Sequence, residues 1–257
     1  MMDYKEEYLR LLREKLTDYK YNNFMYFEPK NYKDLKIGNE ALCTVKEYNT
    51  LDRFYGKDWP NHGETMVGLV RLLNLHELVK DIANHNIEGD FFEAGVWRGG
   101  ASIYLNALNK AYCEGNKKVW LADSYEGLPK SSLPQDLEYD FTKYNELSIP
   151  LEEVVQNFKK YNLLSENVHF LKGWFKDTLP NATVEKIALL RLDGDLYEST
   201  MDILNNLYDK VVSGGYIIVD DYALDCCKQA IADFRNNRGI TEEIIEIDWT
   251  GAYWKKL

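Results

Sequence analysis

Several features that would assign this chain to a class at once are missing from it. It has no run of about 20 apolar residues, the length that a helix needs to cross a bilayer. The segment from Met1 to Glu7 is charged and has no apolar stretch, so we expect no secretory signal peptide. Only 4 of the 257 residues are cysteines, and none are spaced as C-x-x-C. We therefore expect reduced thiols and a cytoplasmic protein.

Positive charge is also scarce. Lys and Arg number 31 against 42 Asp and Glu, which gives a formal net charge of -11. Nucleic-acid phosphates and anionic membrane surfaces attract Lys and Arg clusters, so we expect neither as a partner. The four histidines show no metal-ligand spacing, and the chain has no P-loop, G-x-S-x-G or H-E-x-x-H motif.

The first 62 residues differ from the rest. Tyr8, Leu11, Leu12 and Leu16 have helical spacing, and aperiodic aromatic residues follow, among them Tyr19, Tyr21, Phe24, Tyr26, Phe27 and Tyr32. We predict an N-terminal helical cap or lid over residues 1–62. The remainder, residues 63–257, is predicted to be the main domain.

From residue 63 onward, helical periodicity alternates with short apolar runs. This alternation predicts an α/β fold, a mostly parallel sheet with helices on both faces. The predicted helices are 64–84, 101–112, 151–161, 198–212 and 225–236. The predicted strands are 91–93, 118–122, 168–172, 187–192, 215–219 and a final pair at 241–247 and 252–255.

Four of these strands end in carboxylates: Glu93, Asp123, Asp193 and the pair Asp220–Asp221. Ligands of open parallel sheets bind outside the carboxyl ends of the strands, so we expect the four ends to share one site. The alternative is that these residues are loop acids and helix caps in an acidic protein.

The segment after the first of these strands, Glu93-Ala94-Gly95-Val96-Trp97-Arg98-Gly99-Gly100, is glycine-rich but lacks the G-x-G-x-x-G spacing of dinucleotide sites. An acid at Glu93 would repel a pyrophosphate, whereas it can bind the ammonium of an amino-acid-like ligand, directly or through water. Asp123 can accept hydrogen bonds from both hydroxyls of a ribose, or it can be a helix N-cap together with Ser124. Trp174 and Phe175 can stack on an adenine or pack in the core.

Two acidic pairs, Asp193-Gly194-Asp195 and Asp220-Asp221, end consecutive predicted strands. Neighbouring strands lie about 5 Å apart, so the carboxylates can converge. Their mutual repulsion is relieved by a hard divalent cation such as Mg²⁺, which prefers oxygen ligands. The alternative is a set of N-caps for the helices that follow.

Six blocks of the sequence, in order, resemble the macrocin O-methyltransferase (TylF/MycF) family. They are EAGVWRGG (93–100), ADSYEGLP (122–129), GWFKDTLP (173–180), LRLDGDLYEST (190–200), VDDY (219–222) and EIDWTGAYW (246–254). The resemblance implies a class I methyltransferase, a Rossmann-like fold with a seven-stranded sheet whose last strand is antiparallel. It also implies S-adenosylmethionine as methyl donor, Mg²⁺, and hydroxyls of antibiotic deoxysugars as acceptors.

Carried over residue by residue, the resemblance implies that Asp193, Asp220 and Asp221 bind the metal. It implies Asp195 as general base, with Asp193 as the competing candidate. The implied cofactor contacts are Thr65, Met66, Glu93, Gly95, Val96, Arg98, Gly99, Asp123, Ser124, Gly173, Trp174, Phe175 and Asp193. Pro150 departs from the family, in which we expect a serine.

We therefore predict an S-adenosylmethionine- and Mg²⁺-dependent O-methyltransferase, a homo-oligomer, acting on a small-molecule sugar-bearing acceptor, a natural product or glycan. One alternative is a catechol-type or phenol-type O-methyltransferase. Another is a metal-dependent glycosyltransferase whose D-x-D is Asp193-Gly194-Asp195, which leaves Glu93 unexplained. A non-catalytic binding module would be expected to have lost part of the carboxylate set.

Overall fold

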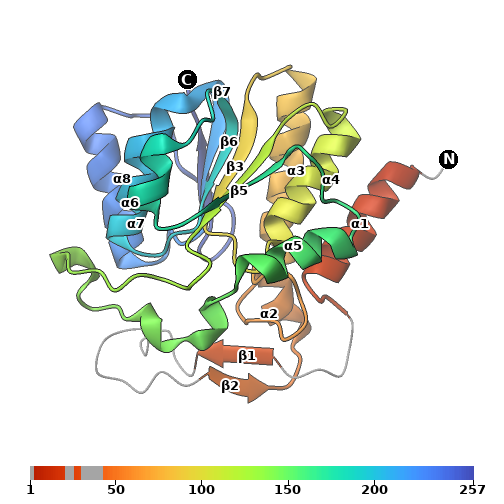
Figure 1. The fold of residues 1–257 in the computed structure, drawn as a ribbon, viewed down its shortest axis with the longest axis horizontal. Helices are drawn as coiled ribbons and strands as arrows, with labels where there is room; N and C mark the ends of the chain where they lie inside the picture. The colour runs from red at the N-terminus through yellow and green to blue at the C-terminus, as the bar shows by residue number, and fades with distance from the viewer. Residues whose placement is uncertain (1–2, 21–25, 30–42) are drawn as a thin grey trace.

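The computed structural model describes residues 3–20, 26–29 and 43–257 (Figure 1). Its main sheet has seven strands in the order β5-β4-β3-β6-β7-β9-β8. The strands are β3 (Asp90–Ala94), β4 (Val119–Asp123), β5 (Val168–Lys172), β6 (Ile187–Leu192), β7 (Val211–Val219), β8 (Ile245–Glu246) and β9 (Ala252–Lys255). β9 runs antiparallel to both of its neighbours, β7 and β8. The predicted seven-stranded sheet with an antiparallel last strand is confirmed, although β8 rather than β9 occupies the edge.

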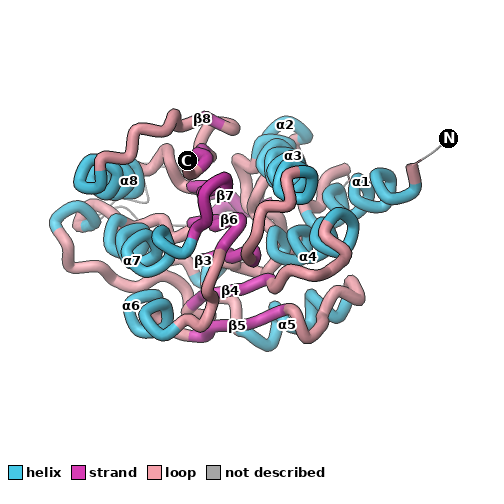
Figure 2. The backbone as a smooth tube through the Cα atoms, turned by 90° about the horizontal axis from the view of Figure 1, so that it is seen from above, coloured by secondary structure: helices cyan, strands magenta, loops and turns pink. Residues whose placement is uncertain are grey.

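Helices cover both faces of this sheet (Figure 2). One side carries α1 (Tyr4–Leu16), α3 (Leu69–Asn84), α4 (Gly100–Tyr112) and α5 (Leu151–Lys160), and the other carries α6 (Phe175–Thr178), α7 (Tyr197–Leu207) and α8 (Asp225–Arg238). The short helix α2 (Thr50–Tyr55) lies beside α3, and a separate antiparallel pair is formed by β1 (Tyr26–Pro29) and β2 (Cys43–Lys46).

Alternation along the strands fills two hydrophobic cores, one under each helical layer. Phe91 and Leu189 are neighbours in register and belong to the core beneath α3 and α4, whereas Phe92 and Leu190 belong to the core beneath α7 and α8. Because both faces are covered, the central strands are apolar at nearly every position rather than at every second one. The predicted α/β class is therefore confirmed.

Helix α1 shows how periodicity can be misjudged. Asp3 caps it, accepting hydrogen bonds from the Lys5 and Glu6 amides. Leu12 and Leu16 are buried with Leu9, in the same core as α3 and α4. Tyr8 and Leu11, expected on the buried stripe, are each 47% exposed. The buried stripe is thus shifted around the helix from the predicted one, and the packing decides which part of the broad apolar face is covered.

Three predicted element boundaries are wrong. The helix expected from residue 64 begins at Leu69, because 64–68 form a loop. The helix expected over 198–212 ends at Leu207, and Val211 and Val212 belong to β7. The strand expected over 241–247 is only Ile245–Glu246.

Part of the predicted cap cannot be compared with the structure. Tyr21, Phe24 and Tyr32 lie outside the described residues, and the boundary between residues 62 and 63 stays a prediction. Within the described residues, no helix combines the length and the apolar content needed to cross a membrane. Cys113, Cys226 and Cys227 are free thiols.

Gly95 sets how closely β3 and β6 approach at their carboxyl ends. Its φ is +88°, a left-handed conformation that favours glycine, and an added Cβ would lie 1.7 Å from the Asp193 carbonyl oxygen. The Gly95 amide donates to the Ala122 carbonyl at 2.9 Å, and the Asp193 amide donates to the Ala94 carbonyl at 2.8 Å. No larger residue fits without displacing a strand end.

We expect Gly95→Ala to lower the free energy of unfolding by at least about 3 kcal/mol, since backbone strain adds to overpacking. The matched control is Gly239→Ala, where φ is +64° and an added Cβ meets nothing within 4 Å. That change should cost only the strain, about 1–2 kcal/mol. Urea unfolding followed by circular dichroism measures both, and equal losses would contradict the steric argument.

Candidate active site

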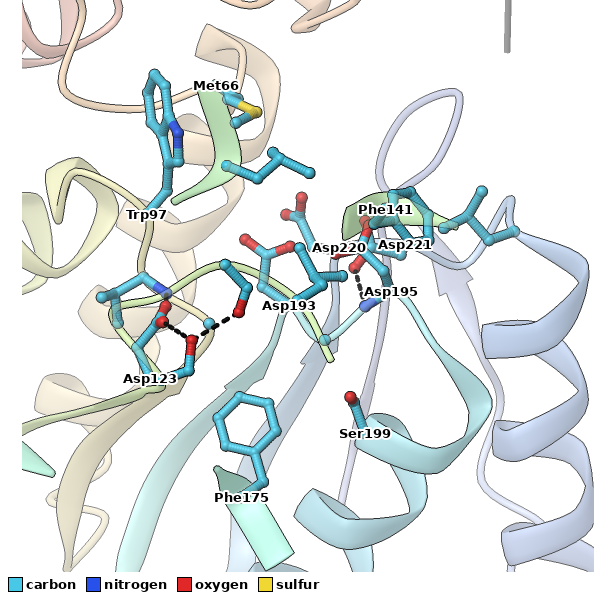
Figure 3. Close-up of a pocket in the computed structure, with 18 of the residues that line it drawn as sticks. Met66, Trp97, Asp123, Phe141, Phe175, Asp193, Asp195, Ser199, Asp220 and Asp221 are labelled. Carbon is cyan, nitrogen blue, oxygen red and sulfur yellow. Dashed lines mark hydrogen bonds between the residues drawn. The ribbon is translucent and has the colours of Figure 1, made fainter. Parts of the chain in front are cut away.

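A cavity of about 720 Å³ lies at the carboxyl ends of the parallel strands. Its walls come from the segments that follow β3, β4, β5, β6 and β7, and from loops within 56–67, 127–147 and 249–250. The strand-end acids Glu93, Asp123, Asp193, Asp220 and Asp221 all line it, and Figure 3 shows the four aspartates. The structure thus brings these acids together at one cavity, while their roles stay predictions.

Most of the predicted cofactor positions line this cavity too. They are Thr65, Met66, Glu93, Gly95, Val96, Asp123, Ser124, Trp174, Phe175 and Asp193. Their roles toward a ligand stay predictions, but their convergence from five separate segments is a property of the fold.

Three predicted cofactor residues, Arg98, Gly99 and Gly173, are not among the residues that line the cavity. Arg98 Nη1 instead donates to the carbonyls of Pro60, Asn61 and Gly63, at 3.2, 3.1 and 3.0 Å. An added Cβ on Gly99 would lie 2.7 Å from Val154 Cγ1, and one on Gly173 would lie 2.7 Å from Thr178 Cγ2. These three residues contact segments that lie outside the lining of the cavity, or close to its edge, rather than the cavity itself.

Asp193, Asp220 and Asp221 form a compact acidic cluster. One carboxylate oxygen from each lies within 4.8 Å of the others. Asp195 completes the group: its φ is +55°, and its amide donates to Asp221 Oδ2 at 3.1 Å (Figure 3). The left-handed conformation at Asp195 turns the chain sharply between β6 and α7, so both acids of the D-G-D sequence border the cavity.

Two buried arginines hold this cluster, and the sequence analysis missed both. Arg191 Nη1 donates to Glu93 Oε1 at 2.5 Å and to Asp193 Oδ2 at 2.8 Å, while Nη2 donates to Asp220 Oδ1 at 2.5 Å. Arg71 Nη1 donates to the second oxygen of Asp220. A signal for Arg191 was available, since it is the one charge in the apolar strand IALLRL. Arg71, in a helix of mixed polarity, gave none.

The arginines do not balance the negative charge. Five acids, Glu93 with the four aspartates just described, face two guanidinium groups. Desolvation in the cavity, followed by repulsion from neighbouring carboxylates, raises the pKa values of Asp193, Asp195 and Asp221. Three convergent carboxylates whose charge is only partly compensated are a donor set that fits Mg²⁺.

Glu93 is 1% exposed, and both of its carboxylate oxygens are bonded, one to Arg191 and the other to the Ser102 hydroxyl. Burial raises its pKa to about 7. Asp123 is likewise engaged, since its two oxygens accept from the Val96 and Tyr125 amides, each at 2.8 Å. A carboxylate has about four acceptor positions, so both residues keep capacity for a ligand.

An aromatic and aliphatic wall borders the acidic cluster, and the sequence did not predict it. Phe141 lines the cavity, and Figure 3 draws it on the side of the cluster away from Asp123. The same wall contains Trp59, Tyr139, Leu147 and Leu224, which pack in one cluster with Phe141. Trp59 packs edge-to-face on Tyr144, with ring centroids 5.4 Å apart. This end of the cavity suits an apolar face of a ligand.

The strand order, with one antiparallel strand inserted next to the edge, and the acids at the ends of β3 and β4 define a class I methyltransferase fold. The sequence model of the macrocin O-methyltransferase family matches residues 5–256. The chain belongs to this family and is an O-methyltransferase, and the family implies S-adenosylmethionine as methyl donor. The glycosyltransferase and binding-module alternatives are therefore wrong.

Named relatives span nearly the whole chain. An 8-demethyl-8-(2,3-dimethoxy-alpha-L-rhamnosyl)-tetracenomycin-C 4'-O-methyltransferase of Streptomyces olivaceus is 42% identical, over 98% of this chain and 94% of that enzyme. A mycinamicin III 3''-O-methyltransferase of Micromonospora griseorubida is 39% identical, over 98% and 96%. Among solved structures, the O-methyltransferase NovP is 40% identical and superposes with a TM-score of 0.85, covering 98% of this chain and 99% of its own.

We expect Asp221→Asn to weaken Mg²⁺ affinity at least about tenfold. Loss of a residue that only hydrogen-bonds to a metal ligand typically has an effect of this size, and Asp221 is itself a proposed ligand. Asp225→Asn is the matched control, because Asp225 is an exposed acid only four residues away, at the start of α8. Titration calorimetry with Mg²⁺ measures both variants. Equal affinities in the two would show that the acidic cluster does not bind the ion.

We also expect Mg²⁺ to stabilise the protein more at pH 8 than at pH 5. The folded-state pKa values of Asp193, Asp195 and Asp221 are raised above the ordinary 3.8. Without metal, the folded state therefore holds protons that the unfolded state has lost, and these groups lower stability as pH rises above that value. Mg²⁺ binds the ionised carboxylates and removes this loss. Thermal unfolding with Mg²⁺ and with chelator at both pH values tests the difference, which a pH-independent Mg²⁺ effect would contradict.

Proposed function

We propose that this enzyme transfers a methyl group from S-adenosylmethionine to a sugar hydroxyl of a small-molecule natural product, with Mg²⁺ bound by Asp193, Asp220 and Asp221. The observation that carries the proposal is the shared cavity, in which this acidic cluster and the strand-end acids Glu93 and Asp123 border the same space. The sugar is supported by the tetracenomycin relative, whose name specifies a rhamnosyl group and a 4'-oxygen.

Asp195 is the residue that we assign as general base. Desolvation and the nearby charges of Asp193 and Asp220 raise its pKa, which makes its carboxylate a stronger proton acceptor than a surface aspartate. Asp193 is the weaker candidate, because its carboxylate is already bonded to Arg191 and belongs to the proposed metal cluster. When bound, Mg²⁺ would supply the positive charge that makes a neighbouring hydroxyl more acidic.

The remaining residues would bind and orient the reactants. Glu93 and Asp123 border the part of the cavity that the cofactor would occupy, and the aromatic and aliphatic wall would pack against the acceptor. A sugar hydroxyl is scarcely ionised at neutral pH, so holding it in line with the methyl group, beside Asp195, is the main task of the site.

We further propose that the enzyme is cytoplasmic, binds neither nucleic acid nor membrane, and forms a homo-oligomer. The net charge of -11 supports the absence of nucleic-acid and membrane binding. Tyr4, Tyr8 and Leu11, exposed along one side of α1, support self-association.

The acceptor class is tested by incubating the enzyme with S-adenosylmethionine, Mg²⁺ and either rhamnosylated natural products or catechols. We expect methylation of the sugar conjugates only, loss of activity in excess chelator, and recovery when Mg²⁺ is restored. Mass spectrometry of the products is the measurement. Methylation of catechols alone would favour the phenol-type alternative, and full activity in chelator would remove the metal from the reaction.

Asp195→Asn should lower kcat by at least about 100-fold, the lower limit for loss of a general base. Affinity for S-adenosylmethionine, measured by calorimetry, should stay within about twofold, because the backbone that shapes the cofactor region is unchanged. Asp225→Asn is again the matched control, with wild-type kcat expected. If the Asp195→Asn enzyme has a kcat close to that of the wild type, Asp195 is not the general base and another residue has this role.

A further inference from the structure

One buried guanidinium, that of Arg71 near the start of α3, joins three separate parts of the site. Its Nη1 donates to Asp220 Oδ2 in the acidic cluster. Its Nε donates to Asp248 Oδ2 at 3.1 Å, and its Nη2 donates to the Gly56 carbonyl at 3.4 Å. Each nitrogen thus serves a different segment, and Arg71 is only 8% exposed.

The first segment is the loop from Gly56 to Gly68. Its two ends are in direct contact, since an added Cβ on Gly56 would lie 2.4 Å from the Gly68 nitrogen. The loop carries Thr65 and Met66, which line the cavity. The bond from Arg71 to the Gly56 carbonyl therefore links the position of this wall to Asp220.

The second segment, residues 248–250, depends on Asp248. The Oδ1 atom of Asp248 accepts from the Thr250 amide at 3.0 Å and from the Gly251 amide at 2.7 Å, while Oδ2 accepts from Arg71. Trp249 Nε1 donates to the Tyr55 carbonyl at 2.7 Å, so this segment is also bonded to the chain just before the first loop. Trp249 and Thr250 both line the cavity.

We propose that Arg71 is a positioning residue that couples Mg²⁺ binding at the acidic cluster to cofactor binding, through the loops 56–68 and 248–250. This inference rests on the proposed function. A cation bound at the cluster draws on the charge of Asp220 and weakens its hold on Arg71, whose guanidinium then binds Asp248 and the Gly56 carbonyl more strongly. The two loops are fixed in consequence, and the cofactor binds more tightly.

Only the planar guanidinium can make these contacts together. Lysine has a single ammonium at the end of a flexible chain. It cannot contact at once the three partners that surround the guanidinium of Arg71. Arg71→Lys keeps the charge beside Asp220 and removes the link between the segments, which separates the positioning role from simple charge compensation.

The test measures the affinity for S-adenosylhomocysteine by calorimetry, with Mg²⁺ and with chelator. This probe lacks the sulfonium charge, so direct repulsion between the ligand and Mg²⁺ is avoided. We expect Mg²⁺ to tighten binding to the wild-type enzyme by about fivefold or more, and S-adenosylhomocysteine to tighten Mg²⁺ binding by the same factor. In Arg71→Lys, Mg²⁺ should change the affinity for S-adenosylhomocysteine by no more than about twofold.

The matched control is Arg53→Lys. Arg53 is also buried and also supports the first loop, since it pairs with Asp58 at 2.9 Å and donates to the Met66 carbonyl. Its variant should weaken S-adenosylhomocysteine binding equally with and without Mg²⁺, so the coupling factor is kept. Urea unfolding of both variants shows that a folded protein is being measured.

The outcomes are distinct. If the wild-type enzyme binds both ligands but its affinity for S-adenosylhomocysteine is the same with Mg²⁺ and with chelator, the proposed function is left intact and the role of Arg71 is overturned. An Arg71→Lys enzyme that keeps the wild-type factor also overturns it. Absence of Mg²⁺ binding to the wild-type enzyme overturns both the metal part of the proposed function and this inference.

Discussion

The whole site depends on the balance between buried carboxylates and the arginines that face them. Strands β3 and β6 are paired so that Glu93 and Arg191 are neighbours in register, and Asp193 follows two positions after Arg191, just past the end of β6. Asp220 follows β7, the next strand. Parallel pairing therefore gathers these charges at one edge, where an arginine from the middle strand reaches acids on both sides. Removing one partner from such a network costs far more than the network contributes to stability.

The same balance suits the two ligands proposed for this edge of the sheet. A sulfonium cofactor and a divalent metal ion are both cationic, and an acid-rich rim attracts both. Arg191 lies between Glu93, on the side proposed for the cofactor, and the acidic cluster proposed for the metal. It reduces the repulsion among the acids while leaving a net negative charge, and that charge adds to desolvation in raising the pKa of Asp195.

The second arginine, Arg71, connects loops that are far apart in the sequence to the acidic cluster. Arg71 and Asp220 are 149 residues apart, and Arg71 and Asp248 are 177 apart. Through these contacts, the wall that covers the cofactor region and the wall that carries Trp249 share one support. The acidic cluster is thus more than the proposed metal site, since it is also the point to which the walls of the cavity are fixed.

The sequence determined the elements and the acids at their ends, because both follow from local patterns. An apolar run followed by Glu93 or Asp193 predicts a buried strand and a charge at its tip without any knowledge of the neighbours, and the family blocks implied a seven-stranded sheet whose last strand is antiparallel. It could not determine which residues meet across the sheet. The pairing of Arg191 with acids on two other strands, the turning of Arg98 away from the cavity, the aromatic wall around Phe141 and the buried stripe of α1 were decided only by tertiary structure. Each of these depends on register and packing between segments that are distant in the chain, and no local pattern encodes such a contact.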